Sequence, residues 1–326
     1  MRFPIYLVSF MKPTEASPLS EGMRDFVRIA ISFQSASDDW LSRRAAFARQ
    51  CSHFTRPATR ALAVTDQRVG GVMTRCYCPV AKAPERGWPV LVFFHGGGWT
   101  TGSHATHDWF AHALLERADL AVISLDYRLA PEASFPAPLD DGLAVWRALA
   151  SSGLPLDCER RAVSGDSAGG TLAAALCVAL RDTREAQPLA QALLYPVLSA
   201  DDAFASVAQH ARAPMLTAQG LAATIALYAP NERDRHTPLA MPLECDDFSR
   251  LAPAFIVAAM EDVLRDQGIE YAARLRQAGG PVELYRGHGF VHAALRATQL
   301  EEVARCYDRL AGFLIERGVA HSRDAE

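Results

Sequence analysis

Apolar and amphipathic stretches alternate along the chain from about residue 89 onward. Segments with apolar residues at helical spacing are typical of helices that pack on a sheet, and they occur at 108–117, 139–151, 269–278 and 300–316. Apolar runs that predict buried strands lie between or before them, at 89–94, 120–125, 192–197, 254–259 and 282–285. Strands that alternate with helices predict an α/β fold with a mostly parallel sheet and helices on both faces.

Two regions depart from this alternation. Residues 19–60 read as helical, with Trp40 to Cys51 as a second segment, and 64–78 alternates like a strand pair around Gly70-Gly71. Between 199 and 250 the pattern lapses into loops with one helical segment, 218–228. A long insertion between two strands often contributes to a binding site.

Composition excludes several classes of protein. The 326 residues are 50% hydrophobic and 21% charged, with a formal net charge of −4, which favours neither nucleic acid nor an anionic membrane as partner. No apolar stretch reaches the roughly 18 residues needed to span a bilayer. The seven cysteines are odd in number, and their spacing matches no metal site, so we expect reduced thiols in a cytoplasmic protein.

The N-terminal residues, Phe3 to Met11, resemble a short signal peptide. Pro4 and Ser9 interrupt the apolar run, and it ends without a cleavage site of the usual small-residue type. A true start at Met11 or Met23 would explain this run equally well.

The stretch from Arg161 to Leu180 has the pattern strand, tight turn, helix. Its turn reads GDSAGG, with Ser167 at the centre and Gly165 and Gly169 two positions either side. This is the setting of a nucleophile elbow, in which a strained turn exposes the serine hydroxyl at a helix N-terminus. The motif alone is also compatible with a glycine-rich turn capped by serine.

A run of three glycines, His95-Gly96-Gly97-Gly98-Trp99, follows the predicted strand 89–94. Glycines allow the backbone to approach a ligand and turn its N–H groups toward it. Such donors stabilise the oxyanion of an acyl-transfer intermediate, and this motif supplies the oxyanion hole of lipases and esterases. The alternative is a flexible loop without a role in catalysis.

Five motifs in the same order resemble those of the hormone-sensitive-lipase family of carboxylesterases, over about residues 65–315. They are HGGGW, then DYRLAPE with FPA, GDSAGG, DVLRDQG from Asp262, and HGF from His288. The resemblance implies an α/β-hydrolase fold and hydrolysis of short- to medium-chain esters without a cofactor or metal. It also implies a cap formed by 1–62 and 199–250 over a catalytic core formed by 63–198 and 251–326.

Carried over by motif position, the resemblance assigns Ser167 as nucleophile, Asp262 as the acid and His288 as the base. Backbone N–H groups of Gly96, Gly97 and Ala168 would bind the oxyanion. His292, four residues beyond His288, is the competing candidate for the base. Glu261 and Asp266 lie near Asp262 and compete for the acid, but Asp266 is expected to cap the following helix or pair with it.

Two positions depart from the family pattern, Val263 in place of proline and Gln267 in place of glutamate. Both leave the predicted acid intact. The expected partner is a small-molecule ester, and the expected oligomeric state is a monomer or homodimer.

An amidase or lactonase could use the same residues, because the pocket sets substrate choice. A non-catalytic binder is a further alternative, because the plant gibberellin receptors resemble this family. Those receptors lack the triad histidine, whereas His288 is present in this chain, so this alternative is disfavoured.

Overall fold

The computed structural model describes residues 18–323 and contains one eight-stranded sheet with the strand order β1-β2-β5-β3-β6-β7-β8-β9. The hairpin β1–β2 and the pair β2–β5 are antiparallel, and every later pair is parallel. The strands are β1 (Leu62–Val69), β2 (Val72–Pro79), β3 (Trp88–Phe94), β5 (Ala121–Leu125), β6 (Leu156–Asp166), β7 (Ala190–Leu194), β8 (Ala254–Glu261) and β9 (Val282–Val291).

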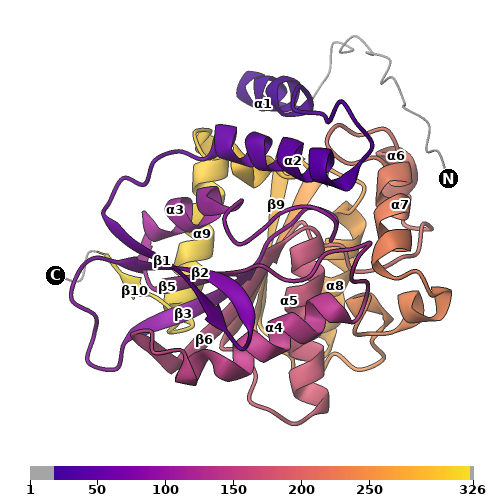
Figure 1. Cartoon of the computed structure of the whole chain (residues 1–326). Coiled ribbons are helices and arrows are strands. Elements are labelled where there is room, and N and C mark those ends of the chain that lie inside the picture. Colours follow the sequence, from indigo (N-terminus) through magenta and orange to yellow (C-terminus); the bar gives the residue numbers. More distant parts are fainter. Residues whose placement is uncertain (1–17, 324–326) are drawn as a thin grey trace.

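Helices cover both faces of the sheet, as the alternating pattern predicts. Figure 1 shows α4 and α5 in front of the sheet, and they join one large apolar core that also includes residues of α8. The other face is covered by α3 and α9, which build a second core. These helices are α3 (Asp108–Leu115), α4 (Ala137–Ala148), α5 (Ala168–Asp182), α8 (Arg265–Gln277) and α9 (Glu301–Glu316). Alternate residues of β3 belong to different cores, so every position of this strand is buried.

Two N-terminal helices, α1 (Glu21–Ile31) and α2 (Trp40–Phe54), lie over one end of the molecule (Figure 1). The residue before each helix caps its N-terminus. The side chain of Ser20 accepts the Met23 N–H of α1, and that of Asp39 accepts the Ser42 N–H of α2. On α2, Arg44 donates to the carbonyl of Thr100 and pairs with Glu132 at 2.6 Å. These bonds fasten α2 to the loops that follow β3 and β5.

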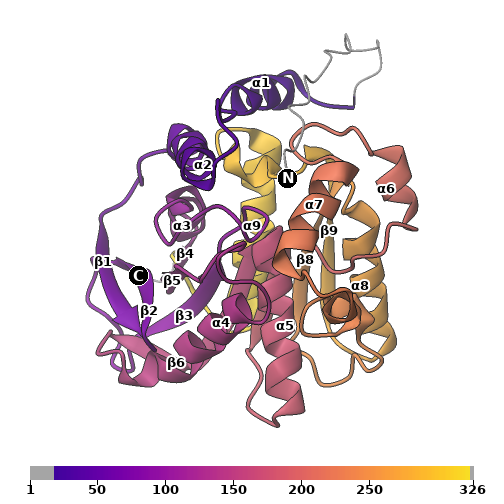
Figure 2. The ribbon, with the colours of Figure 1, turned by 45° about the vertical axis from the view of Figure 1, so that its right-hand side comes forward.

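The insertion between β7 and β8 carries α6 (Ala205–Gln209) and α7 (Ala218–Tyr228), and Figure 2 shows both at the end of the molecule where α1 and α2 lie. Helix α7 packs on the glycine loop, because the rings of Tyr228 and Trp99 stack with centroids 4.2 Å apart. The Phe135 N–H also donates to the Tyr228 carbonyl at 2.7 Å. The insertion therefore contacts the predicted oxyanion loop directly.

Most predicted elements are confirmed within a few residues, and α7 has the predicted bounds. The short pair β4 (Ala118–Asp119) and β10 (His321–Ser322) has no clear sequence signal. The structure corrects one boundary with consequences for the site, since β9 continues six residues beyond the predicted end at Tyr285. The apolar run Phe3 to Met11 lies outside the described residues. Across residues 18–323, none of the helices has the length and apolar character that a membrane crossing requires.

Candidate active site

Ser167 occupies a sharp turn between the end of β6 and the first residue of α5. Its backbone has φ 54° and ψ −119°, a conformation that costs free energy for a residue with a side chain. The turn requires glycine on both sides. A Cβ at Gly165 would lie 2.2 Å from the carbonyl oxygen of Gly169, and one at Gly169 would lie 2.0 Å from that of Phe94. The predicted elbow geometry is therefore present.

The Ser167 hydroxyl belongs to a chain of hydrogen bonds with a histidine and an aspartate. Ser167 Oγ lies 2.8 Å from His292 Nε2, and His292 Nδ1 lies 2.7 Å from Asp262 Oδ2. Because a carboxylate only accepts, Nδ1 carries the proton and Nε2 is free to accept the hydroxyl proton. Asp262 is fully buried, and its Oδ1 also accepts the Leu264 N–H at 3.1 Å. Ser167 remains 7% exposed.

His288, the residue predicted as the base, does not lie at this site. It is exposed on β9, and its imidazole makes no hydrogen bond or ion pair with another residue of the described chain. The expectation for His288 is wrong, and His292 takes the position beside Ser167.

The register of β9 explains this error. Gly287 pairs with Ala259, while Val291 pairs with Glu261, so four steps along β9 match two along β8. The extra residues form a bulge that contains His288, and the strand ends only at Val291. The sequence does contain a signal for the longer strand, the apolar pair Phe290-Val291 after Gly287 and Gly289. This pair indicates that the strand continues past His288 and ends directly before His292.

The glycine loop also differs from the expectation at one position. The Gly96 N–H donates to Asp166 Oδ1 at 2.6 Å, and Gly96 is buried. This amide is therefore occupied, and its predicted role in the oxyanion hole is wrong. In contrast, the amides of Gly97, Gly98 and Ala168 find no acceptor within the described part of the chain. Gly97 and Gly98 have φ of 123° and 60°, conformations that favour glycine.

A buried cluster of ionisable groups lies beneath the loop. Asp166 is fully buried and lies 3.2 Å from His107 Nε2. Although burial acts in the opposite direction, the facing His107 helps to hold the pKa of Asp166 below its ordinary value. His95 stacks on Tyr127 at 4.2 Å, and its Nδ1–H donates to the Gly96 carbonyl at 2.9 Å. Asp166 thus anchors the loop that presents the free amides.

We expect the free energy of unfolding to fall as the pH is lowered from about 6.5 toward 3. Burial, together with the neighbouring His107, lowers the pKa of His95 to about 3. The same imidazole in the unfolded chain titrates near its ordinary value of about 6.5. Between these values only the unfolded chain binds the proton, so stability declines as pH falls, by ~2 kcal/mol at pH 5 for this group.

Urea unfolding at pH 7 and pH 5 measures this loss. In His95→Gln the difference between the two pH values should shrink by about this amount. An equal difference in wild type and variant would contradict the assignment of this acid sensitivity to His95.

Gln267, the second departure from the family pattern, has a structural explanation. Its Oε1 accepts the N–H groups of Leu198 and Ser199 at 2.8 and 3.1 Å, and its Nε2 donates to the Ser199 carbonyl at 3.2 Å. A neutral amide satisfies all three groups, and it holds the chain where the insertion leaves the sheet. Asp266 pairs with a neighbour, Arg265, at 2.7 Å.

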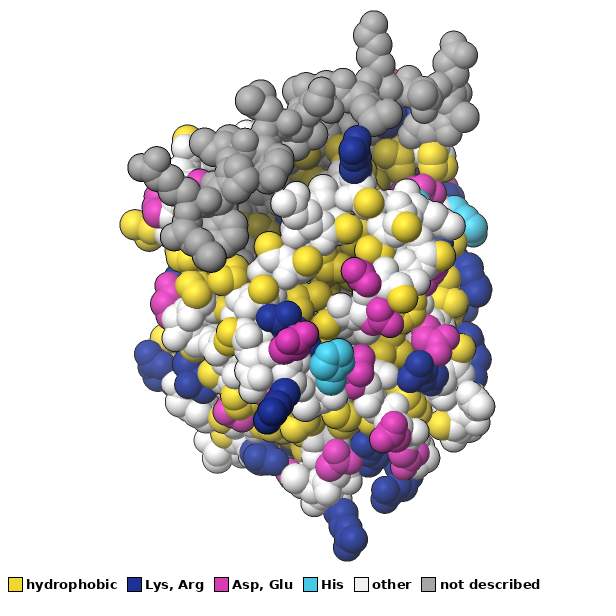
Figure 3. Space-filling model, turned by 90° about the vertical axis from the view of Figure 1, so that its right-hand side faces the viewer, with side chains coloured by type: hydrophobic (Ala, Val, Ile, Leu, Met, Phe, Trp, Pro, Cys, Tyr) yellow, Lys and Arg dark blue, Asp and Glu magenta, His cyan; other side chains and the backbone are white. Residues whose placement is uncertain are grey.

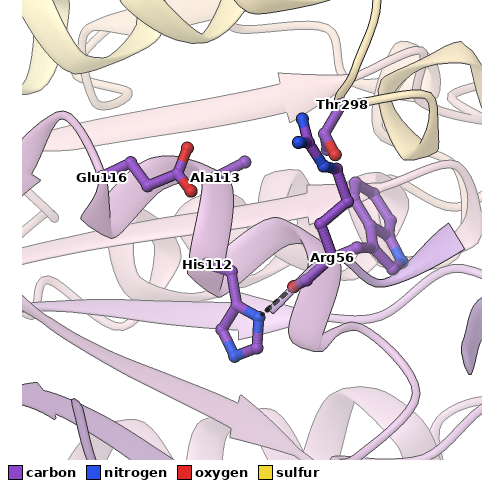
Figure 4. A pocket seen from close by; sticks show the side chains of 6 residues that line it. Arg56, His112, Ala113, Glu116 and Thr298 are labelled. Atoms are coloured by element: carbon purple, nitrogen blue, oxygen red, sulfur yellow. Dashed lines mark hydrogen bonds between the residues drawn. The ribbon is translucent and has the colours of Figure 1, made fainter. Parts of the chain in front are cut away.

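A small pocket lies beside α3. Figure 4 shows this pocket, where His112 Nδ1 donates to the carbonyl of Arg56. Its volume of about 20 Å³ suits a single water molecule. The face on the side of α6 and α7 carries acidic and basic side chains intermixed with hydrophobic ones (Figure 3). Within residues 18–323, no group of three or more His, Cys, Asp or Glu side chains has the arrangement of a metal site.

Comparisons with known proteins bear on the fold and the family of the chain. A family model described as the α/β hydrolase fold matches residues 91–296. Esterase LipI of Mycobacterium tuberculosis is 39% identical over 231 residues, which cover 70% of this chain and 72% of LipI. The ethyl acetate hydrolase of Pseudomonas putida is 37% identical over 246 residues, covering 74% of this chain and 77% of that protein.

A solved structure of an esterase from Pyrobaculum calidifontis superposes with a TM-score of 0.84 at 30% identity, covering 93% of this chain and 100% of that one. The chain belongs to the α/β-hydrolase fold family. Its relatives named as esterases agree with the resemblance to the hormone-sensitive-lipase carboxylesterases.

Proposed function

We propose that the protein is a serine carboxylesterase that hydrolyses short- to medium-chain acyl esters through an acyl-enzyme intermediate. The observation that carries this proposal is the continuous chain of hydrogen bonds from Ser167 through His292 to Asp262. Two relatives named for ester hydrolysis, esterase LipI and the ethyl acetate hydrolase, support the choice of substrate class.

In the acylation step, Ser167 Oγ attacks the ester carbonyl carbon while His292 Nε2 takes the hydroxyl proton. A serine hydroxyl is a weak nucleophile at neutral pH, so this general-base step is necessary. Asp262 accepts the Nδ1–H bond, which fixes the tautomer and stabilises the imidazolium that forms. His292 then returns the proton to the leaving alkoxide oxygen, and the alcohol departs.

The tetrahedral intermediate carries its negative charge on the former carbonyl oxygen. We assign the oxyanion hole to the backbone N–H groups of Gly97, Gly98 and Ala168, because these amides find no acceptor within residues 18–323. Ala168 directly follows Ser167, and the two glycines belong to the loop after β3, the strand that pairs with β6. Ala168 is the first residue of α5, so the helix dipole adds a favourable field. Loss of one such donor typically costs about 3 kcal/mol of barrier.

The acyl-enzyme is then hydrolysed by the same residues. His292 takes a proton from a water molecule, the resulting oxygen attacks the acyl carbon, and Ser167 recovers its proton as the carboxylic acid leaves. One ester and one water thus give one acid and one alcohol, with no other reactant.

Residues 1–62 and 199–250 would form the cap over the core, and the described part of each contacts a loop at the site. Arg44 of α2 bonds to Thr100 after the glycine loop, and Thr224 of α7 approaches Gly98 so closely that a Cβ there would lie 2.9 Å from its Cγ2. We propose a cytoplasmic location because the seven cysteines are odd in number and scattered along the chain, which favours reduced thiols.

We expect turnover to be faster for acyl chains of about eight carbons or fewer. The cap helices close on the loops beside Ser167 and should shorten the space for the acyl group. Initial rates with p-nitrophenyl acetate, butyrate, octanoate and palmitate measure the preference.

The matched control is Ser167→Ala, which should fold like the wild type and lose turnover of all four esters. A palmitate rate above the butyrate rate would overturn the chain-length preference. No turnover of any of them by folded wild type would favour a binding protein instead.

A further inference from the structure

The last residue of β7 and the three residues that follow it contact the nucleophile elbow from one side. The Leu194 carbonyl accepts the Ser167 N–H at 2.8 Å, and the Val197 N–H donates to the Ser167 carbonyl at 3.3 Å. Thr171 Oγ1 of α5 donates to the Val197 carbonyl at 2.5 Å. Residues 194–197 therefore fix the backbone of Ser167 at both its amide and its carbonyl.

Tyr195 lies inside this segment in an unusual conformation. Its φ is 38°, in the left-handed region that a bulky aromatic residue rarely adopts. Its N–H donates to the Val257 carbonyl of β8 at 2.8 Å, and the side chain is 1% exposed. This backbone directs the ring against His292, with ring centroids 5.2 Å apart and planes at 62°.

The hydroxyl of Tyr195 does not explain why the residue is there. Its oxygen is buried and has no hydrogen-bond partner in the part of the chain that the structure describes. Burial, with the charge of Asp166, raises the pKa of this phenol well above its ordinary value. The hydroxyl therefore stays protonated and exchanges no proton with the site at neutral pH, so the contact of interest is the ring.

We propose that Tyr195 is a positioning residue for the hydrolytic reaction, whose ring holds the His292 imidazole in line with Ser167 and Asp262. The inference rests on the proposed esterase function. During turnover, Nε2 exchanges its partner from Ser167 to the leaving oxygen and then to water, while only the Nδ1 bond to Asp262 persists. The single hydrogen bond from Nδ1 to Asp262 would still allow the imidazole to tilt. The Tyr195 ring packed against it restricts this tilt.

Replacement of Tyr195 by leucine should lower kcat for p-nitrophenyl butyrate about 10- to 100-fold and change KM by less than about 3-fold, because a misplaced catalytic group slows the chemical step. Tyr195→Phe keeps the ring, so it should restore kcat to within about 3-fold of wild type. The control for loss of a buried ring is Tyr271→Leu. Tyr271 of α8 is also fully buried, but its ring packs on Phe248.

A second readout separates positioning from stability. The Nδ1–H proton between His292 and Asp262 should give a resolved downfield signal in the proton NMR spectrum of wild type, Tyr195→Phe and Tyr271→Leu. The signal should broaden or disappear in Tyr195→Leu. Tyr271→Leu should lower the melting temperature without lowering kcat, so lost kcat and lost stability are distinguished.

Wild-type kcat and an intact downfield signal in Tyr195→Leu would overturn the inference. So would an equal loss of kcat in Tyr195→Phe, which would assign the effect to the hydroxyl. If Tyr195→Leu is too unstable to assay, the more conservative Tyr195→Met is measured by the same criteria. Absence of Ser167-dependent turnover in wild type would refute the proposed esterase function itself. This result differs from the two outcomes for the Tyr195 variants, which would refute only the positioning role.

Discussion

His292→Ala should lower kcat/KM for p-nitrophenyl butyrate by at least about 10⁴-fold, the scale of loss when a triad histidine is removed. The reason is geometric, since His292 Nε2 is the acceptor 2.8 Å from Ser167 Oγ. Without it, the hydroxyl has no base in reach, and the leaving group has no acid.

His288→Ala should retain kcat/KM within about 3-fold of wild type, since surface changes far from the chemistry have small effects. His288 is exposed on the β9 bulge, and its imidazole has no hydrogen-bond or ion-pair partner within residues 18–323. Steady-state kinetics of the two variants, with circular dichroism to verify folding, decides between the two histidines. A large loss in His288→Ala together with an active His292→Ala would reverse the assignment.

Gly169→Ala should destabilise the protein by about 3 kcal/mol or more, or prevent folding, because the added methyl group overpacks a rigid site. Its Cβ would lie 2.0 Å from the Phe94 carbonyl oxygen and 2.7 Å from that of His95. Both atoms belong to the backbone where β3 enters the glycine loop, so a side-chain rotation cannot relieve the contact. Accommodation would push the elbow away from the loop that faces it.

Gly312→Ala is the matched control, since Gly312 lies inside α9. Apart from the neighbouring backbone of α9, no atom of residues 18–323 would lie within 4 Å of an added Cβ. Here the ordinary helix preference applies, and alanine should stabilise by about 0.5–1 kcal/mol. Urea unfolding of both variants measures the two effects. Equal stabilities of Gly169→Ala and wild type would show that the elbow is not packed as tightly as described.

The sequence was sufficient to predict the sheet, the covering helices and the elbow. These features depend on local signals, namely apolar runs, helical spacing and the glycines around Ser167. The predicted strand 254–259 also placed Asp262 correctly just beyond a strand end, and its side chain reaches His292. The carboxyl ends of parallel strands lie at the same edge of the sheet, so residues that follow different strands can meet there.

Two features of the site depend on contacts between distant segments, and the sequence did not reveal them. The bulge in β9 exists only relative to β8, so the position of His288 could not be judged from its own neighbours. Likewise, the amide of Gly96 is occupied by Asp166, which lies 70 residues away. Motif order identified the right loops, but the direction of individual N–H groups and imidazoles required the packed structure.

The most direct test is covalent labelling with a fluorophosphonate, followed by peptide mass spectrometry. This reagent reports an activated serine, because its phosphorus accepts attack by Oγ and loses fluoride. The account predicts one adduct, on Ser167, whose formation becomes at least about 10²-fold slower in His292→Ala. An adduct on Ser164 or Ser151, or an unchanged labelling rate in His292→Ala, would contradict it.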